Sequence, residues 1–402
     1  MIPRSQILSY LPVTLAVGLA LVLTLVDSQI HPQSEVFQTD SLKALRTLNY
    51  QYQMSVEDIL SNEADSLLIS ELYKADALIP TRSEKDTKGL VVSLKDQDLF
   101  LLLRPQDSLS DEELVEIADA YQRSVPEFAH VELDQEISLE GPVYDLTLYP
   151  KAYPEDKPVE LTSEPTQEVV VAVIDSGIDE THEIFIDVPL DEGWNTITED
   201  STMEDDVGHG THIAGIIVSN APGVTIAPYK IVDSKGGKLS NVLEAFAKAI
   251  EDEVDVVNAS FGLGTSSYAL ETLIGKAYDA GIIVVSAAGN AGKDTGFYPA
   301  GYAQTIAVGS VDAGGHKLTS SNYGSWVDVA AYGYRVKSSI PDNQYGYKTG
   351  TSQSTAFVTA AVARLLMTST EDMSFYEVLS SLEEDSLESI QDGDLAGTPI
   401  VE

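Results

Sequence analysis

The feature that most constrains this chain is an alternation of short apolar runs and helical patterns that begins near residue 169. Almost every residue of these runs is apolar, and an amphipathic or apolar helical stretch separates one run from the next. Such strands predict a parallel sheet covered by helices on both faces, and therefore an α/β fold. Strands are predicted at 169–174, 226–232, 254–257 and 282–285, and helices at 211–218, 243–250 and 270–280.

Four polar residues stand at the ends of predicted elements. Asp175 directly follows the first apolar strand, and His209 lies between two glycines where the first helix starts. Asn290 follows the last of these strands after three small residues, and Ser352 opens a long helix rich in small side chains. Each has an ordinary explanation when taken alone, because Asp is common in turns and Ser is a common helix cap. In a parallel sheet, however, sites form where the strands end.

Taken together, the same four residues make up an acyl-transfer site. The hydroxyl of Ser352 is a weak nucleophile unless a base such as His209 takes its proton. Asp175 can fix the tautomer of the histidine, and the Asn290 amide with the Ser352 N–H can stabilise an oxyanion. The residues therefore predict a serine hydrolase.

Four motifs give the chain a resemblance to the subtilisin-like serine proteases, the subtilase family. They read Val-Ala-Val-Ile-Asp175-Ser-Gly-Ile-Asp, Gly-His209-Gly-Thr-His-Ile-Ala-Gly, Ala-Ala-Gly-Asn290 and Gly-Thr-Ser352. The order Asp, His, Ser is that of subtilisin, and the resemblance covers about residues 168 to 370. It implies a three-layer subtilisin-like domain with a mostly parallel sheet. It also implies a serine endopeptidase with Asp175, His209 and Ser352 as the triad and Asn290 in the oxyanion hole.

The resemblance further implies where a peptide binds. Lys235, Gly236 and Gly237 are expected to form an edge that pairs with extended substrate, which needs little side-chain information. His212 is expected to be a buried, hydrogen-bonded structural residue. The walls of the main specificity pocket are expected to be Ser260, Phe261 and Gly262 on one side and Ala287, Ala288 and Gly289 on the other.

The serine motif departs from the family pattern. Gln353, Ser354 and Ala356 stand where Met, Ala and Pro are usual. Gly350 and Thr351 still fix the register, so the nucleophile is assigned to Ser352. The departure leaves one alternative open, a catalytically silent homologue that binds peptides.

No cofactor is predicted. The chain has no cysteine, and His209 with His212 lacks a third ligand nearby, which disfavours zinc. The acidic position that often helps bind calcium in the family is Ile184 here, so the usual strong calcium site is expected to be absent. A solvated acidic loop is the preferred interpretation of four acids that could also hold a weak calcium site, Asp200, Glu204, Asp205 and Asp206.

The net charge of the chain indicates which partners it can bind, and the N-terminal residues indicate where the protein is located. Lys and Arg total 23 against 64 Asp and Glu, and the net charge of −41 disfavours nucleic acid as a partner. Arg4 precedes an uncharged run of 20 residues at 7–26, and acids follow it. This pattern predicts an exported protein. Residues 1–26 are then a signal anchor, which places the protein on the outer side of the cytoplasmic membrane, or a signal peptide, in which case it is secreted.

The rest of the chain divides by composition. A polar helical stalk is predicted over 27–84. A small α+β unit is predicted over 85–141, in the place of the family propeptide, and it is either a propeptide or a permanent accessory domain. As a propeptide it would be a partner of the chain's own catalytic domain, besides polypeptide substrates. A proline-rich linker at 142–167 precedes the peptidase domain at 168–385, and an acidic disordered tail is predicted at 386–402.

Overall fold

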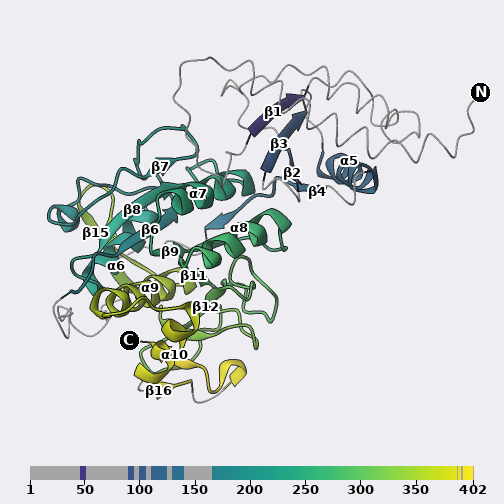
Figure 1. The fold of residues 1–402 in the computed structure, drawn as a ribbon. Helices are drawn as coiled ribbons and strands as arrows, with labels where there is room; N and C mark the ends of the chain where they lie inside the picture. The colour runs from purple at the N-terminus through teal and green to yellow at the C-terminus, as the bar shows by residue number, and fades with distance from the viewer. Residues whose placement is uncertain are drawn as a thin grey trace, which may run out of the picture. The chain divides into compact units, whose positions relative to one another are not determined.

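The structure is a computed structural model in which two compact units divide the chain between Asp134 and Gln135 (Figure 1). The predicted anchor at 7–26 and most of the linker at 142–167 lie outside the described residues. Within the described residues, no helix has the length and apolar character needed to cross a membrane. The structure describes residues 46–50, 89–94, 99–105, 110–124, 129–139, 165–386, 388–390 and 393–401.

The first unit is a small α+β unit with a four-stranded sheet in the order β1-β3-β2-β4. Strand β1 runs parallel to β3, and the other two pairs are antiparallel. Helix α5 buries Leu114 and Ala118, which stand one turn apart on the same helix face. The elements are β1 (Arg46–Tyr50), β2 (Leu90–Leu94), β3 (Leu99–Pro105), α5 (Asp111–Ser124) and β4 (Ala129–Leu133).

Strand β1 corrects the prediction of a helical stalk over 27–84. Leu48 lies in this strand opposite Leu103 of β3. A polar segment with a few leucines is a weak signal for a helix, and pairing with a sheet edge satisfies the same backbone groups. The remainder of 27–84 lies outside the described residues.

The second unit is built on a nine-stranded sheet in the order β16-β17-β13-β12-β11-β9-β6-β8-β7. All neighbouring pairs are parallel except β16 with β17, as the apolar runs predicted. The strands are β6 (Val170–Asp175), β7 (Trp194–Asn195), β8 (Thr225–Lys230), β9 (Val256–Ala259), β11 (Ile283–Ala287), β12 (Thr305–Val311), β13 (Val329–Tyr332), β16 (Glu388–Ser389) and β17 (Pro399–Val401).

Helices cover both faces of this sheet and make a three-layer unit (Figure 1). Helices α6 and α9 pack together, and α7 and α8 pack together. Helix α9 packs on β9, β11, β12 and β13, whereas α7 packs on β6, β7 and β8, and α8 packs on β11. The helices are α6 (Gly210–Asn220), α7 (Leu239–Glu251), α8 (Tyr268–Asp279), α9 (Thr351–Thr368) and α10 (Phe375–Asp385).

Helix α9 lies in the core. Its small residues Ala356, Ala360 and Ala363 are fully buried against the sheet, and a helix that is apolar on most faces is expected to be buried. A hairpin of β14 (Val336–Ile340) and β15 (Gln344–Lys348) precedes this helix and was not predicted.

The prediction of a disordered tail at 386–402 is wrong. Strand β17 extends the large sheet by pairing in parallel with β13, and β16 pairs back onto it. Ile390, Leu395 and Ile400 are buried in one apolar cluster with Val327. The acidic composition hid these apolar positions, which bury enough surface to hold the segment on the sheet edge.

Candidate active site

The predicted catalytic residues come together at the carboxyl edge of the large sheet. Asp175 is the last residue of β6, and His209 immediately precedes α6. Ser352 lies in the first turn of α9, while Asn290 follows β11. The strands β6, β9 and β11 are neighbours in the sheet, so their ends meet in one place.

Asp175 and His209 form a buried hydrogen-bonded pair. The Nδ1 atom of His209 lies 2.8 Å and 2.9 Å from the two carboxylate oxygens of Asp175. The N–H of Ser176 donates to the same carboxylate at 2.7 Å. This arrangement keeps the proton on Nδ1 and leaves Nε2 as the acceptor. Among the described residues Nε2 has no hydrogen-bond partner, so this atom can take a proton from a nucleophile.

A second carboxylate, Asp205, holds the start of the helix that follows His209. Its Oδ1 accepts from the Ser176 hydroxyl at 2.7 Å, and its Oδ2 accepts from the N–H and hydroxyl of Thr211 at 2.9 Å and 2.6 Å. The Ser176 hydroxyl in turn accepts from the N–H of Gly210 at 2.9 Å. A carboxylate at a helix N-terminus is favourable, and this one fixes the position of His209.

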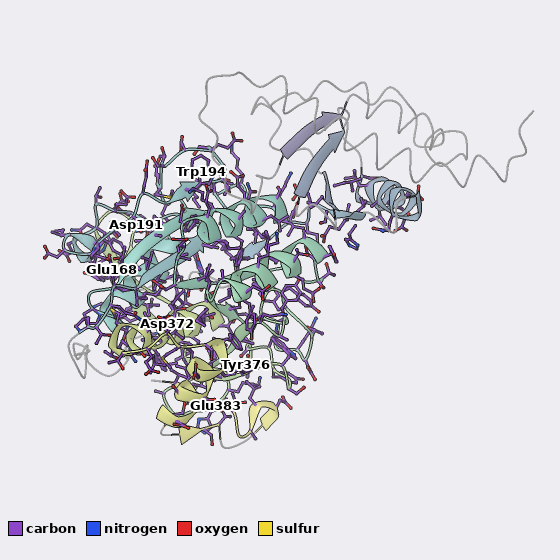
Figure 2. The ribbon with its side chains drawn as sticks, viewed as in Figure 1. Glu168, Asp191, Trp194, Asp372, Tyr376 and Glu383 are labelled. Carbon is purple, nitrogen blue, oxygen red and sulfur yellow. The ribbon has the colours of Figure 1, made fainter. Side chains whose placement is uncertain are left out.

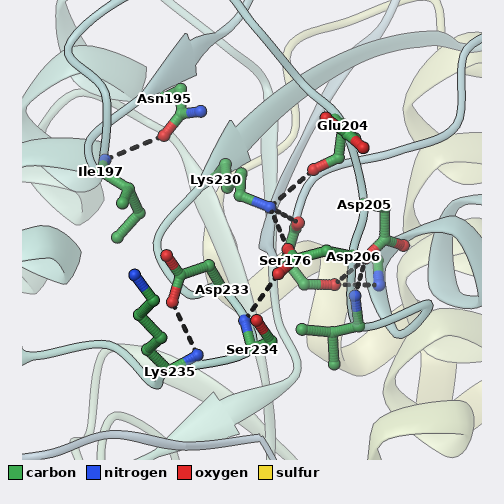
Figure 3. A network of polar contacts seen from close by, with 12 residues as sticks. Ser176, Asn195, Ile197, Glu204, Asp205, Asp206, Lys230, Asp233, Ser234 and Lys235 are labelled. Carbon is green, nitrogen blue, oxygen red and sulfur yellow. Dashed lines mark hydrogen bonds and ion pairs between the residues drawn. The ribbon is translucent and has the colours of Figure 1, made fainter.

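Lys230 ties the strand end to the acidic loop (Figure 3). Its buried ammonium donates to the carbonyls of Ser176 and Glu204 and to Asp206, whose Oδ1 lies 2.8 Å away. Burial pushes the pKa of Asp206 up, but hydrogen bonds from Lys230 and Ser234 outweigh it and hold this pKa at about 2. Asp206 is therefore ionised at neutral pH and paired with Lys230.

These contacts show that the acidic loop has a structural role that the sequence did not reveal. Asp205 caps a helix, Asp206 pairs with a lysine, and Asp200 accepts from Thr198 and Thr202. Among the residues that the structure describes, no group of three or more His, Asp or Glu is arranged to hold a metal. A weak calcium site in this loop stays a prediction.

The hydroxyl of Ser352 faces the first of the two predicted wall segments. It donates to the carbonyl of Ser260 at 3.2 Å, and the Ser260 hydroxyl donates back to the carbonyl of Ser352 at 3.2 Å. Transfer of its proton to His209 requires the hydroxyl to turn toward Nε2. Catalytic hydrogen bonds of this kind often form only when substrate is present.

Asn290 lies beside the same helix start. Its Oδ1 accepts from the N–H of Thr351 at 2.9 Å, which directs the amide NH₂ away from that group. A Cβ on Gly350 would lie 3.0 Å from Nδ2, so glycine allows this close approach. The amide is thereby held next to Ser352, where an oxyanion donor is needed.

The structure gives roles to two of the three residues that depart from the family pattern. The Ser354 hydroxyl is fully buried and donates toward the Ser310 hydroxyl and the Ala331 carbonyl, both at 2.9 Å. It is therefore bound to the sheet and does not compete as a nucleophile. Ala356 is fully buried in the core. Gln353 is 1% exposed, and its amide has no hydrogen-bond partner among the described residues.

His212 lies on the far side of α6 from solvent. Its Nε2 donates to the carbonyls of Val336 and Gly346 at 3.1 Å and 3.3 Å. Burial, followed by the positive charge of Lys348 and then His209, lowers the pKa of His212 to about 3. The neutral ring ties the hairpin β14–β15 to α6.

The two predicted wall segments, residues 260–262 and 287–289, both reach the start of α9. The first contacts Ser352 through Ser260, as described above. In the second, the N–H of Gly289 donates to the hydroxyl of Thr351 at 3.1 Å. The segments lie at the ends of β9 and β11, which pair in parallel, so they stand side by side at the start of α9.

An extended segment of the second unit lies along this edge. Strand β5 (Ser138–Leu139) pairs antiparallel with β10 (Phe261–Gly262), with Leu139 opposite Phe261. The N–H of Ile137 donates to the carbonyl of Gly237 at 3.0 Å. Residues 135–139 were predicted as part of the α+β unit, but they belong to the second unit and occupy the place where an extended peptide is expected.

The pairing edge differs in part from the prediction. Of Lys235, Gly236 and Gly237, only the last pairs with the extended segment. The first two form the turn before it, and the edge continues to Leu239, whose N–H donates to the carbonyl of Gln135 at 2.8 Å. The glycines indicate a turn, and only the tertiary pairing shows which side of the turn meets residues 135–139.

Comparisons with known proteins agree with this geometry. The subtilisin of Bacillus pumilus is 40% identical over 213 residues, which cover 49% of this chain and 76% of that protein. The thermophilic serine proteinase of Bacillus sp. (strain AK1) is 38% identical over 207 residues, and subtilisin NAT of Bacillus subtilis subsp. natto is 38% identical over 213. The chain spans 51% and 55% of the lengths of these two proteins, about half of each.

Solved structures show the same fold. A cold adapted subtilisin-like serine proteinase superposes with a TM-score of 0.55 at 27% identity and covers 61% of this chain and 95% of its own. A lanthipeptide protease superposes with a TM-score of 0.53 at 25% identity and covers 58% and 85%. The profile of the Subtilase family matches residues 166–387. The chain therefore belongs to the subtilase family, the serine endopeptidases that its sequence resembles.

Proposed function

We propose that this chain is an exported serine endopeptidase that hydrolyses peptide bonds through an acyl-enzyme on Ser352. The observation that carries the proposal is the buried pair of Asp175 and His209, which leaves Nε2 without a hydrogen-bond partner among the described residues. Helix α6, which His209 precedes, packs on α9, which bears Ser352. Export rests on the charge pattern around residues 7–26.

In the first half of the reaction, the Oγ of Ser352 attacks the carbonyl carbon of the substrate while Nε2 of His209 takes its proton. Asp175 stabilises the imidazolium that forms. The amide of Asn290 and the N–H of Ser352 stabilise the oxyanion, and His209 then gives the proton to the leaving amine. In the second half, a water molecule loses its proton to His209 and attacks the ester carbon, and His209 then gives this proton to the Oγ of Ser352 as the ester bond breaks and the acid leaves.

The substrate class is extended polypeptide. Residues 135–139 support this, because they form a strand between Gly237 and β10 through main-chain hydrogen bonds, and such pairing accepts many sequences. We take residues 135–139 as a propeptide-like segment that occupies this groove before maturation.

A fluorophosphonate probe tests the proposal. We expect the full chain, once incubated to mature, to form one adduct on Ser352, located by peptide mass spectrometry. Ser352→Ala should lose both the adduct and peptide hydrolysis. Ser354→Ala is the matched control: it removes a hydroxyl two residues away in the same helix and should keep the adduct. A folded protein without an adduct on Ser352 would support the catalytically silent alternative instead.

A further inference from the structure

The ring of Phe297 lies between the two wall segments. A Cβ built on Gly262 would come within 2.2 Å of its Cε1 atom and 2.4 Å of its Cζ atom. A Cβ built on Gly289 would come within 3.0 Å of its Cδ1 and Cγ atoms. One ring thus packs on the glycine of each wall, and its residue is only 7% exposed.

Backbone hydrogen bonds of Phe297 and of the next residue hold the ring in place. Tyr298 pairs antiparallel with Leu263, through N–H to O distances of 2.8 Å and 3.0 Å. The carbonyl of Phe297 itself accepts from the N–H of Gly301 at 2.8 Å. The pairing of Tyr298 with Leu263 therefore fixes the ring of Phe297 against Gly262.

The space that this ring fills is the space a substrate side chain needs. Ser260, in the first wall segment, contacts the Ser352 hydroxyl, and Gly289, in the second, contacts Thr351. The carbonyl that is attacked belongs to the residue before the scissile bond. When this carbonyl lies at Ser352 and Asn290, the side chain of the same residue lies between the two wall segments.

We infer that Phe297 is a specificity-determining residue that restricts cleavage to bonds following a small side chain, namely Gly, Ala or Ser. The inference rests on the proposed function. A larger side chain must displace a ring packed on two backbone segments, and overpacking of this kind is unfavourable. Because one methylene in a pocket changes kcat/KM by about 10- to 200-fold, the full chain should prefer Ala to Phe at this position by at least about 100-fold.

The test uses fluorogenic peptides that differ only in the residue before the scissile bond, as Gly, Ala, Leu or Phe. Rates are divided by the fraction of enzyme that reacts with the fluorophosphonate probe. We expect Phe297→Ala to raise kcat/KM for the Phe peptide by at least about 10-fold while the Ala peptide is still cleaved. Phe297→Leu, which keeps the space filled, should retain the preference for Ala. Phe246→Leu, a fully buried phenylalanine in α7, is the matched control and should leave the ratio unchanged.

The outcomes separate the inference from the function on which it rests. A probe-labelled wild type that cleaves the Phe and Ala peptides equally overturns the role of Phe297 and leaves the endopeptidase proposal standing. A chain that takes no label and cleaves no peptide overturns both. If the cavity in Phe297→Ala prevents folding, the inference is tested by the ratio of kcat/KM for the Ala peptide to that for the Phe peptide. This ratio is then compared between the wild type and Phe297→Leu.

Discussion

Asn290 has two ends with different tasks. Its Oδ1 is held by the N–H of Thr351, and its Nδ2 lies against Gly350, two residues before Ser352. In the reaction that we propose, the hydrogen bond on one side positions the amide, so that the donor on the other side is already in place when negative charge develops. A donor fixed in advance pays no reorganisation cost during the reaction.

Asn290→Ala should therefore lower kcat by about 10²- to 10³-fold, the effect of losing one oxyanion donor, with little change in KM, because the interaction is made mainly in the transition state. Steady-state kinetics on probe-titrated enzyme measures both constants. Asn220→Ala is the control, since that amide only donates to the Ile216 carbonyl within α6 and should leave kcat unchanged. A kcat loss below about 10-fold would mean that another donor carries the oxyanion.

At the scale of elements, the last strands change the boundary of the peptidase domain. Strand β17 lies between β16 and β13 in the large sheet, and its Ile400 stands opposite Ala330 of β13. Leu395 and Ile390 pack in the same cluster. The peptidase domain therefore includes residues beyond 385, which the composition had predicted to be a disordered tail.

Ile400→Asp should destabilise the second unit, because it puts a carboxylate into this apolar cluster. A cost of about 3 kcal/mol for a poorly solvated polar group corresponds to a Tm decrease of about 6–12 °C in a domain of this size. Calorimetry on the Ser352→Ala background avoids autolysis. Ala396→Asp, at an exposed turn position, is the control and should leave Tm unchanged. An equal Tm for both variants would show that the tail does not contribute to the folded domain.

For the whole molecule, the dominant property is its negative charge of −41. Much of it lies on the surface of the second unit, where Glu168, Asp191, Asp372 and Glu383 are exposed (Figure 2). With 23 basic residues to offset 64 acidic ones, these carboxylates repel one another more than they pair. Such self-repulsion opposes the compact state.

Screening should therefore stabilise this protein. Raising NaCl from about 10 mM to about 150 mM shortens the Debye length from about 30 Å to about 8 Å, and we expect Tm of the Ser352→Ala variant to rise by several degrees. The same concentrations of an uncharged sugar are the control and should have no comparable effect. A falling Tm would show that attractive pairs such as Lys230 with Asp206 outweigh the repulsion.

The sequence by itself determined the parallel α/β sheet and the candidate catalytic residues. Both depend on local patterns. Apolar runs define the strands, and Asp175, His209, Asn290 and Ser352 each stand within three residues of the end of a strand or the start of a helix. Parallel strands bring such ends to a single edge, so residues far apart in the chain could be placed together before any contact was known.

Only the tertiary structure decided the features that depend on which surfaces meet. Phe297 reaches Gly262 across 35 residues, and Ile137 reaches Gly237 across 100. Asp205 was interpreted as part of a solvated loop until its contacts with Ser176 and Thr211 showed otherwise. Propensity and periodicity act over a few neighbouring residues, whereas a ring between two walls and a carboxylate under a helix result from packing between distant segments.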